Sequence, residues 1–350
     1  MARINPEFTK KLKSYGAFDV NACYNCGNCT AVCALSDEKN SFPRKMVRYS
    51  VLGLENEIEM ALEPWLCYYC GECSTTCPRQ AEPGELMMSL RRWLTAKYDW
   101  TGLSGLLYRS LSASLTAFIL LAVVVVAFAY YQGFGTGKLL HYGHYFEMIA
   151  IAGVFAFILL PNLIRMWYLT IAKPKVKVLP ANYFKVLGEL FVHMFTQKRA
   201  LGCDDNRIRW FEHFILVIGY LSLLFTTVFL DWFATGSGFV TAMGYIESAI
   251  IFSVTFLFVL SRITKKEEVS KHAHPSDWFF VVWLFLMGVS AFLVRLFIDL
   301  GLLEQNIWIY VVHLIILVQW ALIIVPFGKW THFLYRSFAM YFQSVKESAK

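Results

Sequence analysis

Charged residues are scarce in this sequence. Of its 350 residues 16% are charged and 57% are hydrophobic, which excludes an ordinary soluble protein. Residues 1–18, MARINPEFTKKLKSYGAF, lack the apolar run of a signal peptide, so we expect the N-terminus to stay in the cytoplasm. No basic stripe interleaved with aromatic residues is present to bind nucleic acid, and basic membrane loops account for the net charge of +7. The composition favours a membrane protein with a soluble extension, residues 1–100.

Six long apolar segments follow this extension. Each is long enough to cross a hydrocarbon layer of ~30 Å, which takes about 20 helical residues. Lys and Arg gather in the loops at 173–209 and 265–271, whereas the loops on the other side contribute only Lys138. This bias predicts an inner-membrane protein with both termini in the cytoplasm. The predicted spans are approximately Leu106–Tyr131, His144–Ile171, Trp210–Phe233, Tyr245–Ile263, Trp278–Leu300 and Ile307–Phe333, with a short amphipathic surface helix at 183–195.

Eight of the nine cysteines fall in two runs. CYNCGNCTAVC begins at Cys23 and CYYCGECSTTCP begins at Cys67, and both have the spacing C-x2-C-x2-C-x3-C. Three thiolates of such a run bind one 4Fe-4S cluster, and the fourth binds the neighbouring cluster. The spacing therefore predicts two clusters, the first held by Cys23, Cys26, Cys29 and Cys77, and the second by Cys67, Cys70, Cys73 and Cys33.

Zinc and disulfide bonds are the alternatives for these cysteines. Zinc sites usually have two separated C-x2-C pairs, and a reducing compartment disfavours disulfides. The helical periodicity between the runs predicts an all-α module. Cys203 stands alone and is interpreted as structural. Because no adjacent cysteine pair remains for a substrate-converting cluster, we expect the chain to carry electrons rather than to act alone on a soluble substrate.

Histidines occur within the apolar spans, where they are costly and usually functional. His313 and His332 are nineteen residues apart, a rise of about 28 Å along one helix, which suits two b-type haems stacked across a membrane. We expect His213 to pair with His332 at an inner haem, and His144 to pair with His313 at an outer haem, with His141 as the alternative partner. Hydrogen bonds to carbonyls or headgroups are the competing explanation.

Three further histidines are interpreted differently. His193, on the surface helix, is expected to pack against its neighbours, although it could border the inner haem. His272 and His274 lie in the charged loop KKEEVSKHAHPSD and are expected to be solvated.

Two parts of the sequence resemble known families. Residues 15–95 resemble the small iron–sulfur subunit of heterodisulfide reductases, through both cysteine runs and through FPRKMVRYSVLGL, EPWLCYYC and TTCPR. The last span, with HLIILVQWALIIVPFGKWTH, resembles the gamma subunit of respiratory nitrate reductase, which also has a Pro-Phe pair between two haem histidines. The two parts in this order are similar to the membrane C subunit of the quinone-interacting membrane-bound oxidoreductase (Qmo) complexes of sulfur metabolism.

This resemblance implies a fold, cofactors and partners. The fold would be all-α, with a two-cluster helical ferredoxin-type domain at 1–100 and a six-helix cytochrome b bundle at 101–350. The cofactors would be two 4Fe-4S clusters and two b haems, with menaquinone as substrate. Cytoplasmic flavin/iron–sulfur subunits resembling the A subunit of heterodisulfide reductase would be the partners, with adenylylsulfate reductase beyond them.

The sequence departs from the families at two positions. Leu223 stands where the nitrate reductase relatives have a second histidine, so the outer haem needs another ligand or is absent. Ala34 rather than proline follows Cys33, which is a minor change.

A quinone site needs titratable groups that lipid can reach, because reduction takes two protons and two electrons. On the outer side the candidates are Glu147, Glu247 and Arg295, although Arg295 could simply pair with Asp299. The outer side is favoured because two haems spanning the membrane would be superfluous if quinone reacted beside the clusters. On the inner side the candidates are Glu212 and the basic residues around Lys198.

Two rival functions fit the same sequence. The chain could serve a heterodisulfide reductase, a hydrogenase or a formate dehydrogenase, which the co-purifying subunits would reveal. It could also be a transporter or membrane anchor regulated by iron–sulfur clusters, which absence of haem from the purified protein would favour; inverted repeats and paired broken helices are not evident.

Overall fold

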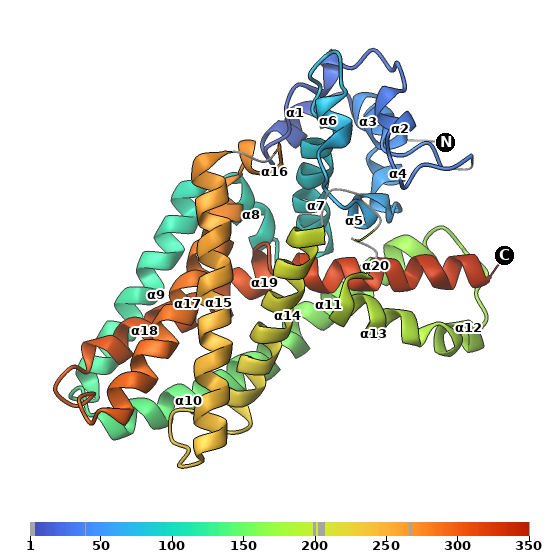
Figure 1. Ribbon diagram of the computed structural model, residues 1–350. Helices are drawn as coiled ribbons and strands as arrows, with labels where there is room; N and C mark the ends of the chain where they lie inside the picture. The colour runs from blue at the N-terminus through green and yellow to red at the C-terminus, as the bar shows by residue number, and fades with distance from the viewer. Residues whose placement is uncertain (1–3, 39, 199–200, 202–206, 266–267, 350) are drawn as a thin grey trace.

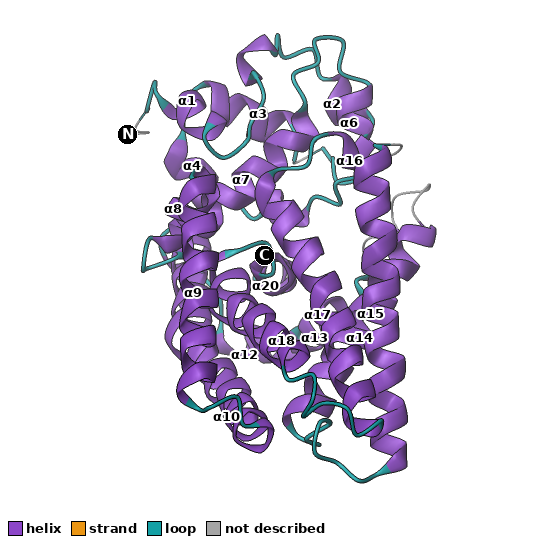
Figure 2. Cartoon of the chain, turned by 90° about the vertical axis from the view of Figure 1, so that its left-hand side faces the viewer, coloured by secondary structure: helices purple, strands orange, loops and turns teal. Residues whose placement is uncertain are grey.

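The chain is helical throughout its described part. The computed structural model describes residues 4–349 except 39, 199–200, 202–206 and 266–267. In these ranges every regular element is a helix, and the one extended pairing is an isolated bridge between Asp37 and Asn40. Figure 2 shows the helices joined by loops. The predicted all-α fold is confirmed.

Short helices dominate the first hundred residues. The two cysteine helices, α2 and α6, each begin at a glycine in the left-handed region, Gly27 with φ 94° and Gly71 with φ 91°. Glycine adopts this conformation without a steric penalty, so both runs repeat one local geometry. The elements are α1 (Phe8–Lys13), η1 (Val20–Ala22), α2 (Asn28–Ala31), α3 (Arg44–Val51), α4 (Glu55–Glu59), α5 (Glu63–Leu66), α6 (Glu72–Thr75), α7 (Pro83–Tyr98) and α8 (Leu103–Arg109).

Within the described residues, six helical stretches are long and apolar enough to cross a membrane. All six predicted spans fall on these stretches, although the second begins earlier than predicted, at Thr136, the fourth at Gly238 and the fifth at Pro275, and the sixth is interrupted. The stretches are α9 (Leu111–Tyr131); α10 (Thr136–Val154) with η2 (Phe155–Leu159), α11 (Leu160–Trp167) and η3 (Tyr168–Ala172); α14 (Arg207–Val228); α15 (Gly238–Thr264); α17 (Pro275–Asp299); and α18 (Trp308–Gln319) with η5 (Trp320–Ile324), α19 (Val325–Phe327) and α20 (Thr331–Ser348).

The sixth stretch is broken near its middle. Gly328 has an extended conformation, φ −102° and ψ −163°, and α20 leaves in a new direction (Figure 1). Pro326 cannot donate a backbone hydrogen bond, and a Cβ on Gly328 would lie 2.8 Å from the carbonyl oxygen of Ile324. The prediction that His313 and His332 lie on one straight helix is therefore wrong, because His332 begins a separate helix.

The predicted surface helix consists of two helices. They are α12 (Pro180–Lys185) and α13 (Leu187–Thr196), and α13 packs against α20. His193 Nε2 lies 3.2 Å from a carboxylate oxygen of Glu189 on the same helix, in line with the packing role expected for it. The short helix α16 (Glu268–Lys271) follows α15.

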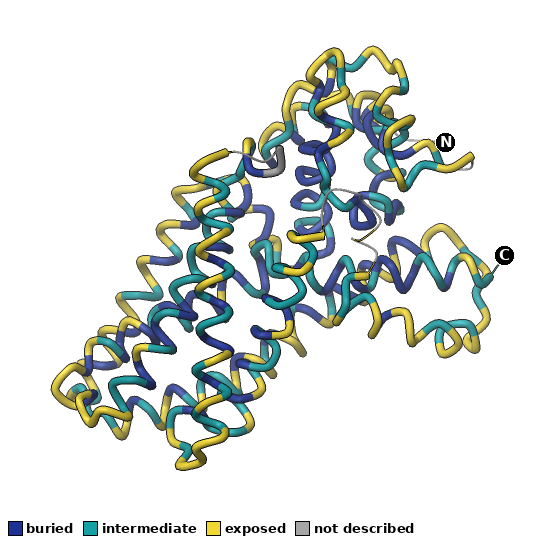
Figure 3. Tube along the Cα trace, in the orientation of Figure 1, coloured by how far each residue is buried: buried dark blue, intermediate teal, exposed yellow. Residues whose placement is uncertain are grey.

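The N-terminal extension and the membrane helices share one hydrophobic core. Trp65 from α5 and Tyr98 from α7 each pack edge-on against Tyr335 from α20, with ring centroids 5.4 and 5.5 Å apart. All three side chains belong to one buried cluster that also includes residues of α10 and α11. Figure 3 shows buried residues continuing from α7 into α20, whereas the long helices are exposed along their outer faces. Burial therefore couples the cysteine region directly to the helix that carries His332.

We expect Gly288→Ala to destabilise the bundle where α17 crosses α15. A Cβ at Gly288 would lie 2.9 Å from the backbone nitrogen of Phe252, and a backbone atom cannot rotate away. Overpacking of this kind costs about 1–3 kcal/mol. Thermal unfolding of the detergent-solubilised protein measures the loss, with Gly153→Ala as control because the added methyl would meet no atom within 4 Å. Equal melting temperatures for both variants would contradict the predicted close contact.

Candidate iron–sulfur and haem sites

The structure brings the eight cysteines of the two runs together in two groups. The Cys29 thiol interacts electrostatically with those of Cys23, Cys26 and Cys77. The Cys33 thiol has Cys67 and Cys70 as its strongest charge partners, and Cys73 interacts most with the same two thiols. Helices α2 and α6 pack against each other, which places the last cysteine of each run beside the other run.

The environment of these thiols suits thiolates that are bound to metal. Burial raises the pKa of Cys33 to about 11 and also raises the pKa of Cys67 and Cys73, so these thiols need bound metal to be thiolates at neutral pH. Backbone N–H groups point at two sulfurs: Asn25 N lies 3.4 Å from Cys23 Sγ, and Tyr69 N lies 3.3 Å from Cys67 Sγ. The donor set, four thiols in each group, is that of a 4Fe-4S cluster.

A single metal ion needs its ligands closer together than a cluster does. Zinc holds its sulfur ligands at about 2.3 Å, so their sulfurs converge closely on one point. Within the described ranges, no three side chains of His, Cys, Asp or Glu converge in this way. Cys203, interpreted from sequence as structural, lies outside the described residues.

Two histidines lie close together at the end of the long helices that is nearer the cysteine runs. The rings of His213 from α14 and His332 from α20 have centroids 6.4 Å apart with an angle of 70° between their planes. Two imidazoles that bind opposite sides of one metal at ~2.0 Å have centroids roughly 6 Å apart. His332 Nδ1 lies 2.5 Å from the carbonyl oxygen of Lys329, which leaves Nε2 available to bind a metal. His213 Nδ1 is buried and has no hydrogen-bond partner among the described residues.

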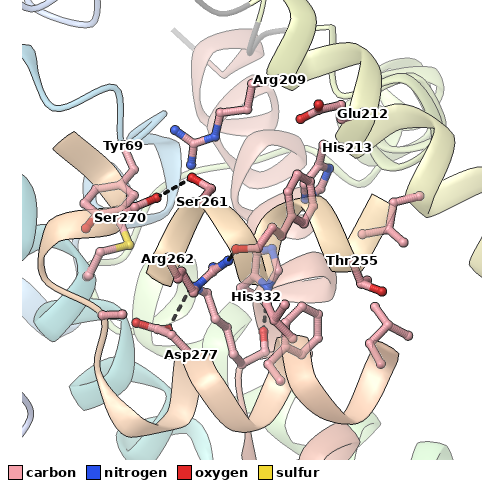
Figure 4. A pocket seen from close by; sticks show the side chains of 18 of the residues that line it. Tyr69, Arg209, Glu212, His213, Thr255, Ser261, Arg262, Ser270, Asp277 and His332 are labelled. Carbon is pink, nitrogen blue, oxygen red and sulfur yellow. Dashed lines mark hydrogen bonds and ion pairs between the residues drawn. The ribbon is translucent and has the colours of Figure 1, made fainter. Parts of the chain in front are cut away.

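These histidines line a cavity of about 340 Å³ (Figure 4). Its lining includes basic side chains, among them Arg209, Arg262 and Lys329, and apolar side chains such as Leu216 and Phe280. A haem has the same division, with an apolar ring and two carboxylates. Tyr68 and Tyr69, which separate Cys67 from Cys70, also line the cavity. The residues present therefore fit a haem that borders the second cysteine run.

The proposed outer pair is less closely arranged. His313 is buried, its Nδ1 lies 2.9 Å from the hydroxyl of Ser290, and the ring of Phe233 packs against it. His144 is partly exposed and lies 3.8 Å from the Asp231 carboxylate. Among the described residues, no ring contact joins His313 to His144 or to the alternative partner His141. Leu223, which replaces the family histidine, is buried in the apolar cluster between the helices.

The outer quinone candidates lie in two places. Glu147 is partly buried on α10 and interacts electrostatically with Asp231 and Tyr310. Glu247 is buried on α15, and its Oε2 atom has no hydrogen-bond partner in the described part of the chain. Both carboxyl groups are able to exchange protons, Glu147 from α10 and Glu247 from α15.

Arg295 instead has structural partners. It lies 2.8 Å from Asp299 Oδ1, and it donates to the hydroxyl of Thr241 at 3.1 Å and to the carbonyl of Trp232. The pairing with Asp299 that the sequence left open is therefore present. On the inner side, Glu212 lines the histidine cavity, whereas Lys198 is exposed.

Several residues of this region were not anticipated. Asp277 at the start of α17 binds both Arg92 from α7, at 3.2 Å, and Lys329, at 2.7 Å. His274 was expected to be solvated, and that was wrong: its ring accepts a hydrogen bond from Ser276 N at 3.2 Å and caps α17. The signal available in the sequence was HPSD, a capping residue followed by proline at a helix start. His272 packs against the ring of Phe18.

Comparisons with known proteins agree with the cysteine geometry. Residues 19–81 match the 4Fe-4S dicluster domain family. A protein from Archaeoglobus profundus described as like the C subunit of heterodisulfide reductase is 32% identical over 88 residues, which make up 25% of this chain and 47% of that relative. The chain thus spans about half the length of the curated relative it matches, and no solved structure matches it. The N-terminal region is therefore similar to iron–sulfur dicluster domains, and within the described residues it is joined to six helical stretches that are long and apolar enough to cross a membrane.

Glu85 generates a pH-dependent stability. Tyr69 donates a hydrogen bond to this carboxyl group, and burial raises its pKa to about 7 from an ordinary 4.5. Between these values the folded protein binds more protons than the unfolded chain, so its stability falls as the pH rises from about 4.5 to about 7. Glu85→Gln, which stays neutral, should remove this part of the pH dependence.

Melting temperatures measured from roughly pH 5 to pH 8 test this expectation. Glu7→Gln is the control, because its side chain is 66% exposed and paired only at the surface. An unchanged pH profile in Glu85→Gln would show that the folded carboxyl group titrates normally.

Proposed function

We propose that this protein is the membrane electron-transfer subunit of a quinone-linked oxidoreductase, with two 4Fe-4S clusters and haem b. The observation that carries the proposal is one cavity wall shared by His213, His332 and the second cysteine run. Tyr68 and Tyr69 stand between Cys67 and Cys70 in the chain and line the same cavity as the two imidazoles. A cluster and a haem bound there are neighbours, as electron exchange requires.

The chain's own residues perform three tasks in this function. Iron–sulfur clusters and haem supply one-electron chemistry when bound. The thiols hold the clusters, and His213 and His332 hold the haem from two different helices. The apolar wall formed by Leu216, Phe280 and Leu284 excludes water from the ring, and the basic wall offers partners for its carboxylates.

The first cluster is the proposed contact with soluble partners. Cys26 is exposed, and the neighbouring Tyr24 is 59% exposed. A flavin/iron–sulfur protein resembling the A subunit of heterodisulfide reductase is the proposed partner, with adenylylsulfate reductase as the enzyme served. Service to a heterodisulfide reductase has support of its own, since the matched relative is named after the C subunit of that enzyme.

Menaquinone is the proposed electron partner within the membrane. Glu147 lies where it interacts with Asp231 and Tyr310 at the end of the bundle opposite the cysteines, and α10 there is exposed on its outer face. A proton-carrying carboxyl group at a lipid-accessible surface supports quinone chemistry on this side. His313, with His144, is the proposed ligand pair of a second haem that would connect the quinone to the inner haem.

We expect His213→Ala and His332→Ala each to remove the same b-type haem. Each substitution deletes one of the two imidazoles that would hold this haem, so the reduced α-band should fall by half if the wild type binds two haems, and disappear if it binds one. Pyridine haemochrome analysis of the purified protein measures the content, and His193→Ala is the control because its ring pairs with Glu189 on α13. Normal haem content in both variants would exclude this site, and a wild type without haem would exclude the proposed function.

The cysteine grouping makes a second prediction. Because Cys33 belongs with the second group and Cys77 with the first, Cys33→Ser should perturb the cluster of the second run and Cys77→Ser that of the first. Electron paramagnetic resonance of the anaerobically purified protein separates the two reduced clusters. If each substitution alters only the cluster of its own run, the crossed arrangement is wrong.

A further inference from the structure

Arg91 connects the second cysteine run to the histidine cavity. It projects from α7, and its guanidinium donates to the Pro64 carbonyl at 2.7 Å and to the Cys67 carbonyl. These two carbonyls lie at the start of α5 and at the first ligand of the second run. One side chain therefore fixes the main chain that leads into the run.

The same guanidinium lies on the wall of the cavity. Arg91 lines it together with His332, and its charge acts on both Cys67 and His332. Burial lowers its pKa to about 10, so Arg91 keeps its positive charge at neutral pH. Arg336 of α20 lies beside it, with its guanidinium 5.7 Å from the centroid of the Tyr68 ring.

We propose that Arg91 is a positioning residue shared by the two redox sites, which holds the second cysteine run against the cavity and raises the reduction potentials of both the second cluster and the inner haem. The inference rests on the proposed function, since it assumes a haem between His213 and His332. It adds a residue that touches neither iron but acts on both centres through its positive charge.

The physical reason is electrostatic. Reduction adds one negative charge to each centre, and a fixed positive charge close by in a medium of low polarity stabilises the reduced form. At about 10 Å with an effective dielectric constant of ~20, this changes the reduction equilibrium by roughly tenfold or more. A tenfold change corresponds to 59 mV for a one-electron couple.

Redox titration of the purified full-length protein tests the proposal. In Arg91→Gln the charge is lost, and we expect the reduction equilibria of the second cluster, followed by paramagnetic resonance, and of the inner haem, followed by its α-band, to fall about tenfold each. Arg91→Lys keeps the positive charge but loses the planar guanidinium group. We therefore expect both reduction potentials of this variant to lie close to those of the wild type. Arg48→Gln, an exposed residue on α3, should leave both potentials unchanged because water screens its charge.

The outcomes separate this inference from the proposed function. A wild type without haem overturns the proposed function, whereas wild-type potentials in a fully loaded Arg91→Gln overturn only the role of Arg91. Equal shifts in the Lys and Gln variants would show that charge is not the cause and also overturn it. If Arg91→Gln loses the second cluster, the haem titration alone decides: a fall of the haem potential supports the proposal, and an unchanged haem potential overturns it.

Discussion

The carboxylate of Asp277 holds together the elements around the histidine cavity. It forms ion pairs with Arg92 from α7, at 3.2 Å, and with Lys329 from the loop before α20, at 2.7 Å. Asp277 itself lies in the first turn of α17. Three elements distant in sequence are thereby held together where water is largely excluded. Removing one member of such a group leaves a buried charge without compensation, which costs several kcal/mol. The site histidine His332 follows Lys329 by three residues, and the carbonyl of Lys329 orients its ring.

This arrangement explains why a cysteine-rich extension and apolar helices occur in one chain. In the proposed function, soluble partners reach the clusters from water whereas quinone dissolves in lipid, so electrons would pass the boundary between the two. The shared core of Trp65, Tyr98 and Tyr335 gives that boundary a fixed geometry. Arg91 lies at the same boundary and contacts the cysteine run on one side and the cavity on the other. Packing and redox function therefore use the same few elements.

Some sequence predictions were wrong for identifiable reasons. The last span was expected to be straight because its apolar residues continue past Gly328, but Pro326 and Gly328 interrupt the helix there. His274 was expected to be solvated because its neighbours are charged, yet it caps α17 and packs beside Gly16. In both cases local composition was outweighed by backbone geometry and by a contact with a distant part of the chain.

What the sequence by itself determined was the helical fold, the six apolar stretches and the two cysteine runs. These are local properties, because hydrophobic length, hydrogen-bond saturation in lipid and ligand spacing act over a few turns of chain. Only the tertiary structure decided that the rings of His213 and His332 lie 6.4 Å apart, while among the described residues no ring contact joins His313 to His144. It also placed Arg91 between Cys67 and the cavity. Such juxtapositions depend on how helices cross, and helix crossing is set by side-chain packing between segments that the sequence keeps far apart.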